Sequence, residues 1–175
     1  MPLGAGDYSS SGYNTDSGDV FDIGKAGHYA STELLQLVTF RLGDEWYALE
    51  SKHVRGIEAE AEITPVPLAP EWLLGVFNLH GTILPIVDIK PLLQNSKKGQ
   101  QSKGLFLIIH WDGNSAALSV DTVDEIYEVH PSSLEQQNEN VDKDSSELIL
   151  GKVRVRDRLI GVVNALALVR ALTEG

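Results

Sequence analysis

The chain has 175 residues, of which 42% are hydrophobic, and this is enough to bury the core of one medium domain or of two small subdomains. The net charge of −11 excludes strong attraction to nucleic acid or to an anionic membrane surface unless a local basic patch exists. The basic cluster Lys97, Lys98 and Lys103 lies in a Gln, Ser and Gly-rich stretch, which is typical of a solvated loop. The absence of cysteine excludes a disulfide scaffold, a thiolate zinc site and a cysteine nucleophile.

Residues 1–32 are rich in Gly, Ser, Asp and Tyr and carry almost no aliphatic pattern. Such a segment cannot bury enough surface to offset the entropy of ordering, so it is predicted to be a disordered tail before a domain over residues 33–175. No basic region followed by an apolar run stands at the N-terminus, and nowhere do about 18 apolar residues follow one another. We therefore expect a soluble protein that does not insert into a membrane, and the absence of cysteine suits a reducing cytoplasm.

The first predicted elements are strands. "LQLVTFRL" (35–42) and "WYALE" (46–50) flank the turn "GDE", and alternation places Val38, Phe40 and Leu42 on one face. "GIEAEAEI" (56–63) alternates apolar and acidic residues, which predicts a strand with one buried and one wet face. The apolar face would carry Ile57, Ala59, Ala61 and Ile63.

The proline-rich segment "TPVPLAP" (64–70) is predicted to be a structured connector, because each proline fixes its own φ and lacks an amide proton. A second hairpin follows, with Leu73–Leu79 and Ile83–Ile89 as strands and His80-Gly81 as the turn. Pro85 inside the return strand indicates an edge, a bulge or the start of a strand.

The remaining elements repeat the hairpin pattern. A third hairpin covers residues 105–120 about "DGNS", "VDEIYEV" (123–129) is a further strand, and a fourth hairpin has strands 148–155 and 159–163 about "RDR". Asn164 is placed to cap a C-terminal helix whose apolar residues recur at helical spacing. The fold class is mainly β, a barrel or a sandwich, with one amphipathic helix at the end.

The sequence shows no catalytic or metal-binding motif. The five histidines, His28, His53, His80, His110 and His130, are scattered without metal-ligand spacing, and a calcium-like start at Asp142 lacks the glycine and the final carboxylate that such a loop needs. A carboxylate pair could still be assembled from Asp88, Asp121, Asp124 and Glu125, although acids at strand ends more often cap turns. We expect a binding module that is not an enzyme and uses no cofactor and no metal.

Four stretches in order along residues 34–172 resemble the CheW-like domain, the chemotaxis coupling protein family: "FRLGDEWYALESKHVRGI", "LLGVFNLHGTILPIVDIKPLL", "ALSVDTVDEIYEV" and "LILGKVRVRDRLIGVVNALALV". The resemblance implies two SH3-like five-stranded β-barrel subdomains around a shared apolar core. It also implies a non-enzymatic adaptor that links the cytoplasmic tips of chemoreceptors to the regulatory domain of a CheA-type histidine kinase, in an array at the membrane.

In the family, the kinase-facing surface uses the segments that match "HVRGI" and "NLHG", while receptor tips dock near the groove between the barrels. The resemblance therefore gives a set of candidate partner-binding residues, and each also has a structural explanation. Core packing competes for the three apolar residues, backbone geometry for Gly75 and Gly81, and a hydrogen bond to the turn for Asn78. The candidates are Val54, Gly56, Ile57, Gly75, Asn78, Leu79, His80 and Gly81.

Two positions depart from the family pattern. His80 stands where the family usually has Arg, and Gly56 stands where an acidic residue is common. Histidine is near neutral at pH 7 and cannot make the bidentate contact of arginine, so the departures favour a changed partner or a weakened contact. The alternative is that both sides of the interface changed together. The departures suggest a paralogue serving pili-driven motility or phototaxis. Two other readings stay open: a small-ligand-binding barrel outside chemotaxis, and a hydrolase using dispersed carboxylates.

Overall fold

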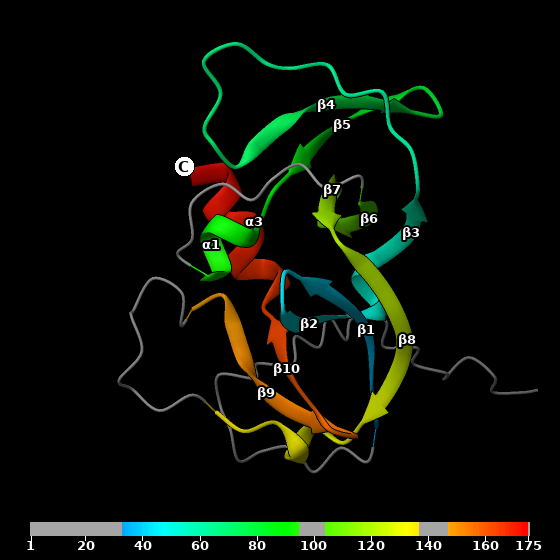
Figure 1. The fold of residues 1–175 in the computed structure, drawn as a ribbon, viewed down its shortest axis with the longest axis vertical. Helices are drawn as coiled ribbons and strands as arrows, with labels where there is room; N and C mark the ends of the chain where they lie inside the picture. Colours follow the sequence, from blue (N-terminus) through cyan, green and yellow to red (C-terminus); the bar gives the residue numbers. More distant parts are fainter. Residues whose placement is uncertain (1–32, 95–103, 137–146, 175) are drawn as a thin grey trace, which may run out of the picture. The chain divides into compact units, whose positions relative to one another are not determined.

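The computed structural model describes residues 33–94, 104–136 and 147–174. The predicted tail over 1–32, the lysine cluster and the rejected calcium-like loop lie outside these described residues. Within the described ranges the chain forms ten strands and two α-helices (Figure 1). Their bounds are β1 Leu35–Leu42, β2 Glu45–Glu50, β3 Val54–Glu58, β4 Leu73–Leu79, β5 Thr82–Val87, α1 Lys90–Gln94, β6 Leu105–Trp111, β7 Asn114–Val120, β8 Thr122–Val129, β9 Ile149–Val155, β10 Arg158–Val163 and α3 Ala165–Glu174.

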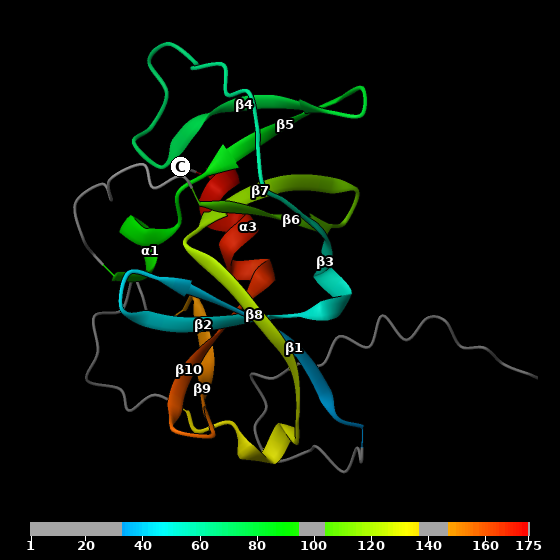
Figure 2. The same cartoon turned by 45° about the vertical axis from the view of Figure 1, so that its right-hand side comes forward.

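The strands form two five-stranded sheets, which confirms the mainly β fold class with two five-stranded subdomains and a short C-terminal helix. Sheet A has the order β8-β1-β2-β10-β9, and sheet B has the order β3-β6-β7-β5-β4. The chain therefore changes sheet twice, after β2 and after β7, so that β8 leaves sheet B and joins β1 in sheet A (Figure 2). The two subdomains are interleaved along the sequence.

All four predicted hairpins are present. The turn His80-Gly81 is as predicted, whereas the other three turns are shorter than predicted, with two residues each: Gly43-Asp44, Asp112-Gly113 and Arg156-Asp157. At the tips of β4–β5 and β6–β7, both central residues have positive φ: 49° and 92° for His80 and Gly81, and 46° and 79° for Asp112 and Gly113. Such two-residue turns match the right-handed twist of the strands that they join. Pro85 lies where β5 is paired on one side only, because the pairing with β7 begins at Ile86.

The predicted strand over residues 56–63 is wrong in its second half. β3 ends at Glu58, and Ile57, expected on the buried face, is 48% exposed. Ala61 and Ile63 do pack against the core of sheet B, but they do so from the connector and not from a strand. In residues 60–63 the alternation of apolar and acidic side chains marks which of them face the core and which face solvent, in a segment that is not a paired strand.

The connector returns to sheet B at Thr64, which exchanges two backbone hydrogen bonds with Val76 of β4, at 2.8 and 2.9 Å. This approach needs a glycine in β4. A Cβ on Gly75, whose φ is 151°, would lie 2.5 Å from the Thr64 carbonyl oxygen and 2.6 Å from the Ile63 side chain. Gly75 therefore has a structural role.

The helix α1 was not predicted. It has five residues, which is too short for a visible helical periodicity, and it contains Pro91. Its start is marked by Asp88, whose carboxylate accepts a hydrogen bond from the Lys90 backbone N–H at 3.0 Å. The predicted helix α3 is confirmed with its cap, since the Asn164 side-chain oxygen accepts a hydrogen bond from the Ala167 N–H at 3.1 Å.

Three apolar clusters hold the fold together. One lies in sheet A and includes Leu37, Ala48 and Ile160. A second lies in sheet B and includes Phe77, Ile86 and Phe106. The third, the shared layer, combines side chains of both sheets with α1 and α3. Its buried members are Val38, Phe40, Leu42, Tyr47, Leu49, Val87, Ile89, Leu93, Leu107, Ile109, Leu118, Val120, Leu148, Val163, Ala165 and Leu168.

Leu168→Ala should lower the free energy of unfolding by about 2–5 kcal/mol, because it opens a cavity at a fully buried site in the shared layer. Leu159→Ala on β10 is the matched control: that side chain is exposed, so the change should stay within about 1 kcal/mol. Urea denaturation followed by tryptophan fluorescence measures both variants. Equal losses at the two positions would contradict the role given to the shared layer.

Gly75→Ala should destabilise the protein by about 1–3 kcal/mol, because the new methyl group would collide with the backbone of Thr64. Gly56→Ala is its control, since no atom lies within 4 Å of the position that its Cβ would take. The control should change stability by no more than about 0.5 kcal/mol in the same denaturation experiment. A neutral Gly75 variant would show that the connector can move away from β4.

Candidate functional site

The β4–β5 turn places His80 at an exposed tip of sheet B. Its geometry is fixed from below, because the Asn78 side-chain oxygen accepts a hydrogen bond from the Gly81 N–H at 2.7 Å. Asn78 thus makes the hydrogen bond to the turn that was one of its two explanations, and Asn78, His80 and Gly81 are all exposed. An added Cβ at Gly81 would meet no atom within 4 Å, so its glycine serves the φ of 92°.

The other two residues of this segment point into the fold. Leu79 is half-buried and packs against the cluster of sheet B. Gly75 is buried and accommodates the Thr64 bridge. Of the five candidates between residues 75 and 81, His80 and Gly81 therefore form the exposed turn, and the other three support its conformation.

The β3 group of candidates divides in the same way. Val54 is half-buried against the shared layer, whereas Ile57 is largely exposed. Gly56 faces open space, so a larger side chain would fit there. Gly56 and Ile57 are thus available to a partner. Exposure of the Ile57 side chain to water is unfavourable, so a partner that buries it on this edge strand would gain affinity.

The sheet order separates the two groups of candidates. β3 is one edge of sheet B and β4 is the other, with β6, β7 and β5 between them. Strand pairing therefore does not bring the "HVRGI" and "NLHG" segments together. The connector that follows β3 links the two edges through its bridge to Val76.

Three exposed apolar side chains near these segments were missed by the sequence reasoning. Ile83 is 61% exposed and lies opposite Asn78 in the β4–β5 register. Val66 is partly exposed, and Leu68 is fully exposed with a φ of 58°, both in the proline-rich connector. Ile83 could have been found from its alternation with the buried Leu84 and Ile86, but nothing in the sequence marks Leu68 as outward.

His53 lies at the change from sheet A to sheet B, in the short 3-10 turn Ser51–His53. Its ring contacts Trp111 at the end of β6, with ring centroids 4.2 Å apart. Burial against the indole, with a smaller contribution from the charge of Lys52, lowers the pKa of His53 to about 4. The ring is therefore neutral near pH 7 and suited to packing.

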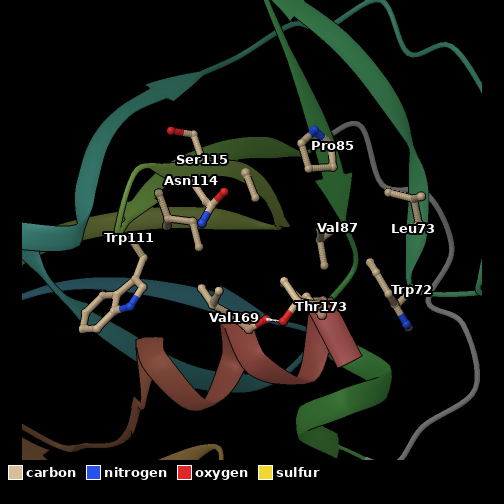
Figure 3. Close-up of a pocket in the computed structure, with 12 residues that line it drawn as sticks. Trp72, Leu73, Pro85, Val87, Trp111, Asn114, Ser115, Val169 and Thr173 are labelled. Atoms are coloured by element: carbon tan, nitrogen blue, oxygen red, sulfur yellow. Dashed lines mark hydrogen bonds between the residues drawn. The ribbon is translucent and has the colours of Figure 1, made fainter. Parts of the chain in front are cut away.

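An apolar pocket of about 400 Å³ lies between sheet B and α3 (Figure 3). Trp111 and Trp72 stand at its opposite sides in this view, with Val87 and Val169 between them. The polar lining side chains are Asn114, Ser115 and Thr173, and no lining side chain carries a formal charge. The pocket can take an apolar group, and the Oγ of its lining residue Ser115 lies 3.0 Å from the Nδ1 of His110.

The acidic residues considered for catalysis form hydrogen bonds to backbone N–H groups or ion pairs with arginines. Asp88 caps α1, and the Asp121 carboxylate accepts a hydrogen bond from the Gly43 N–H at 2.5 Å. Asp124 forms an ion pair with Arg158, whose hydrogen bond holds the pKa of that carboxyl below its ordinary value. No cluster of three or more potential metal ligands occurs among the described residues.

Within the described part of the chain, no helix is both long and apolar enough to cross a membrane.

Comparison with known proteins agrees with this architecture. The chain is 27% identical over 126 residues to the chemotaxis protein CheW of Treponema pallidum, covering 70% of this chain and 74% of that protein. It is 26% identical over 130 residues to the chemotaxis protein CheW of Bacillus subtilis, covering 74% and 83%. The crystal structure of the scaffolding protein TtCheW from Thermoanaerobacter tengcongensis superposes with a TM-score of 0.68 at 27% identity, covering 81% of this chain and 91% of that one.

The family model of the CheW-like domain matches residues 36–173, which span both sheets and α3. The chain therefore belongs to the CheW-like family of chemotaxis coupling proteins, which act as scaffolds and not as enzymes.

Proposed function

We propose that this protein couples chemoreceptors to a CheA-type histidine kinase. The observation that carries the proposal is the exposed turn of sheet B, where Asn78 and Gly81 fix the backbone, His80 is exposed at the tip, and the exposed Ile83 lies opposite Asn78. A polar side chain next to an exposed apolar one, on a rigid turn, is suited to specific protein contact. The kinase regulatory domain binds this turn together with Gly56 and Ile57 of β3, and receptor tips dock near the groove between the subdomains.

The two departures from the family pattern then adjust the kinase contact. An arginine at the turn would offer a fixed fork of donors, and an acid on β3 would offer a charged acceptor. His80 and Gly56 provide neither. The open space at Gly56 means that its glycine is not demanded by packing. This supports a chain adapted to another kinase, in a pathway for pili-driven motility or phototaxis.

The remaining parts of the proposal concern the whole chain. Residues 33–175 form the coupling domain, and residues 1–32 form the tail before it. The protein works in the cytoplasm, at membrane-associated receptor arrays, through partners and not through insertion of its own. Array contacts gain strength from many weak interactions held in one geometry, so single contacts of micromolar strength suffice.

His80→Ala should weaken binding to the kinase regulatory domain at least about fivefold, because it truncates an exposed side chain at the proposed contact. Isothermal titration of the full chain against the regulatory domain from the same organism measures this. Asp112→Ala at the β6–β7 turn is the matched control, because Asp112 also occupies the first turn position with positive φ. It should bind like the unmodified protein, and the two variants should lose similar, small amounts of stability.

A large loss of stability with unchanged binding would show that His80 is structural. No binding of the unmodified protein up to about a millimolar would mean that this kinase is not the partner. Two further variants test the departures directly: His80→Arg and Gly56→Glu restore the residue types usual in the family, and each should tighten binding to a kinase of a flagellar pathway. Unchanged affinity in both variants would show that His80 and Gly56 do not determine which kinase is bound.

The pocket favours a second candidate function, the binding of a small neutral apolar compound. Two of the three tryptophans, Trp72 and Trp111, line it, while Trp46 contacts Arg158 outside it. A ligand from a panel of neutral metabolites should therefore change the intrinsic fluorescence, and the change should disappear in Trp72→Phe/Trp111→Phe but persist in Trp46→Phe. A fluorescence response that survives in the double variant, or none at all across the panel, would exclude this function.

A further inference from the structure

The strand β9 carries a line of positive charge on a protein whose net charge is −11. Lys152 and Arg154 are exposed, and Arg156 follows directly after the strand and is also exposed. Because successive side chains of a strand alternate, Lys152 and Arg154 share one face, at a spacing of about 7 Å, whereas Arg156 lies in the turn with a φ of 54°. Gly151 and Val153, on either side of Lys152 in the chain, are buried, so this face of β9 cannot rotate inward. These three residues are called the basic strip.

Within the part of the chain that the structure describes, the backbone of β9 is also unpaired on its outer side at Arg154. β9 is an edge of sheet A (Figure 1), where β10 pairs with one side of it. Lys152 uses its other side, exchanging two 2.8 Å hydrogen bonds with Glu135. Antiparallel pairing alternates along a strand, so the N–H and C=O of Arg154 point to that same side. Among the described residues no strand pairs with this edge beyond the Glu135 bridge.

The three charged side chains of the strip differ in their interactions with the rest of the protein. Arg156 lies 3.6 Å from the Glu125 carboxylate and over the Tyr127 ring, both on β8. Lys152 and Arg154 make no ion pair with any described residue. The strip thus has Arg156 anchored to β8, Lys152 bridged to Glu135 through its backbone, and an outer backbone edge at Arg154 that no described residue pairs with.

We propose that the β9 edge binds an extended acidic polypeptide segment, which adds to sheet A as a sixth strand. Its backbone pairs with Arg154, and its carboxylates, on alternate residues, lie opposite the basic strip. Main-chain hydrogen bonds supply affinity in this mode of recognition, and the matched side-chain charges supply specificity. The surface lies on sheet A, away from the candidates on sheet B, and it does not depend on the kinase or the receptors.

The charge pattern selects against other occupants. A second copy pairing through the same edge would place two basic strips against each other. A flat anionic surface, such as a membrane, would meet the acids that flank the strip, Glu125 and Asp157, as well as its cations. An extended strand that pairs at Arg154 lies next to the side chains of Arg154 and Lys152, and Glu135 is the acid bridged to Lys152 at this edge. The observations therefore favour an acidic peptide.

Amide NMR spectra of the labelled full chain, titrated with a blocked nine-residue peptide of alternating Glu and Thr, test the proposal. We expect saturable shifts at Lys152 and Arg154, and hydrogen exchange at the Arg154 amide at least about tenfold slower in the bound protein. The matched peptide of alternating Lys and Thr should cause neither. Arg154→Glu should weaken binding at least about tenfold, whereas Arg170→Glu, the same change on an exposed position of α3, should not.

Several results would overturn the proposal. Shifts confined to other surfaces, equal binding by the two peptides, or equal affinity of the Arg154→Glu protein would each do so. Binding to phosphatidylserine vesicles that is lost in Arg154→Glu, without binding of the acidic peptide, would assign the strip to a membrane. Slowed exchange at Arg154 that grows with protein concentration, and without peptide, would assign it to a second copy.

Discussion

The structure depends on the apolar layer that the two sheets share. β1 shows why: Leu37 belongs to the cluster of sheet A, whereas Val38 and Phe40 belong to the shared layer, so the strand is buried on both faces. β6 does the same in sheet B, with Phe106 and Ile108 on one side and Leu107 and Ile109 on the other. Neither sheet can leave the other without exposing a full face of aliphatic side chains, and the two subdomains therefore form one cooperative unit.

The chain passes from one sheet to the other between β2 and β3 and between β7 and β8, and a polar side chain stabilises each of these connections. Asp121, the single residue between β7 and β8, donates its N–H to the Arg41 carbonyl and accepts the Gly43 N–H. At the other connection, His53 is packed against Trp111 and kept neutral by burial. The pKa of His53 is about 4 in the folded protein and 6.5 in the unfolded chain, so the unfolded chain binds a proton more readily between these two pH values. The contribution of this contact to stability is therefore lost as the pH falls from 6.5 towards 4.

Much of the fold could be predicted because hairpins are local. Turn residues such as His80-Gly81 and the alternation beside them mark the strand ends, and Asn164 marks the start of α3. Features made by distant segments could not be predicted. β3 was extended to Ile63 because alternation does not reveal where pairing stops, and α1 is too short to show a period. The pocket is assembled from several strands and α3, and the basic strip appears only once β9 is known to be an outer edge.

For the candidate site, the sequence could supply segments but not orientation. Gly75 and Leu79 belong to β4, which directly precedes His80, yet Gly75 makes room for the Thr64 bridge and Leu79 packs against the sheet B core. The exposed surfaces lie on edges and turns of sheet B, and the basic strip lies on sheet A. An adaptor gains avidity only if its contacts are held at a separation that its partners can span, and a loose joint between subdomains would dilute that gain. The shared layer removes such a joint, so the same burial that stabilises the fold fixes the distance between the surfaces that it presents.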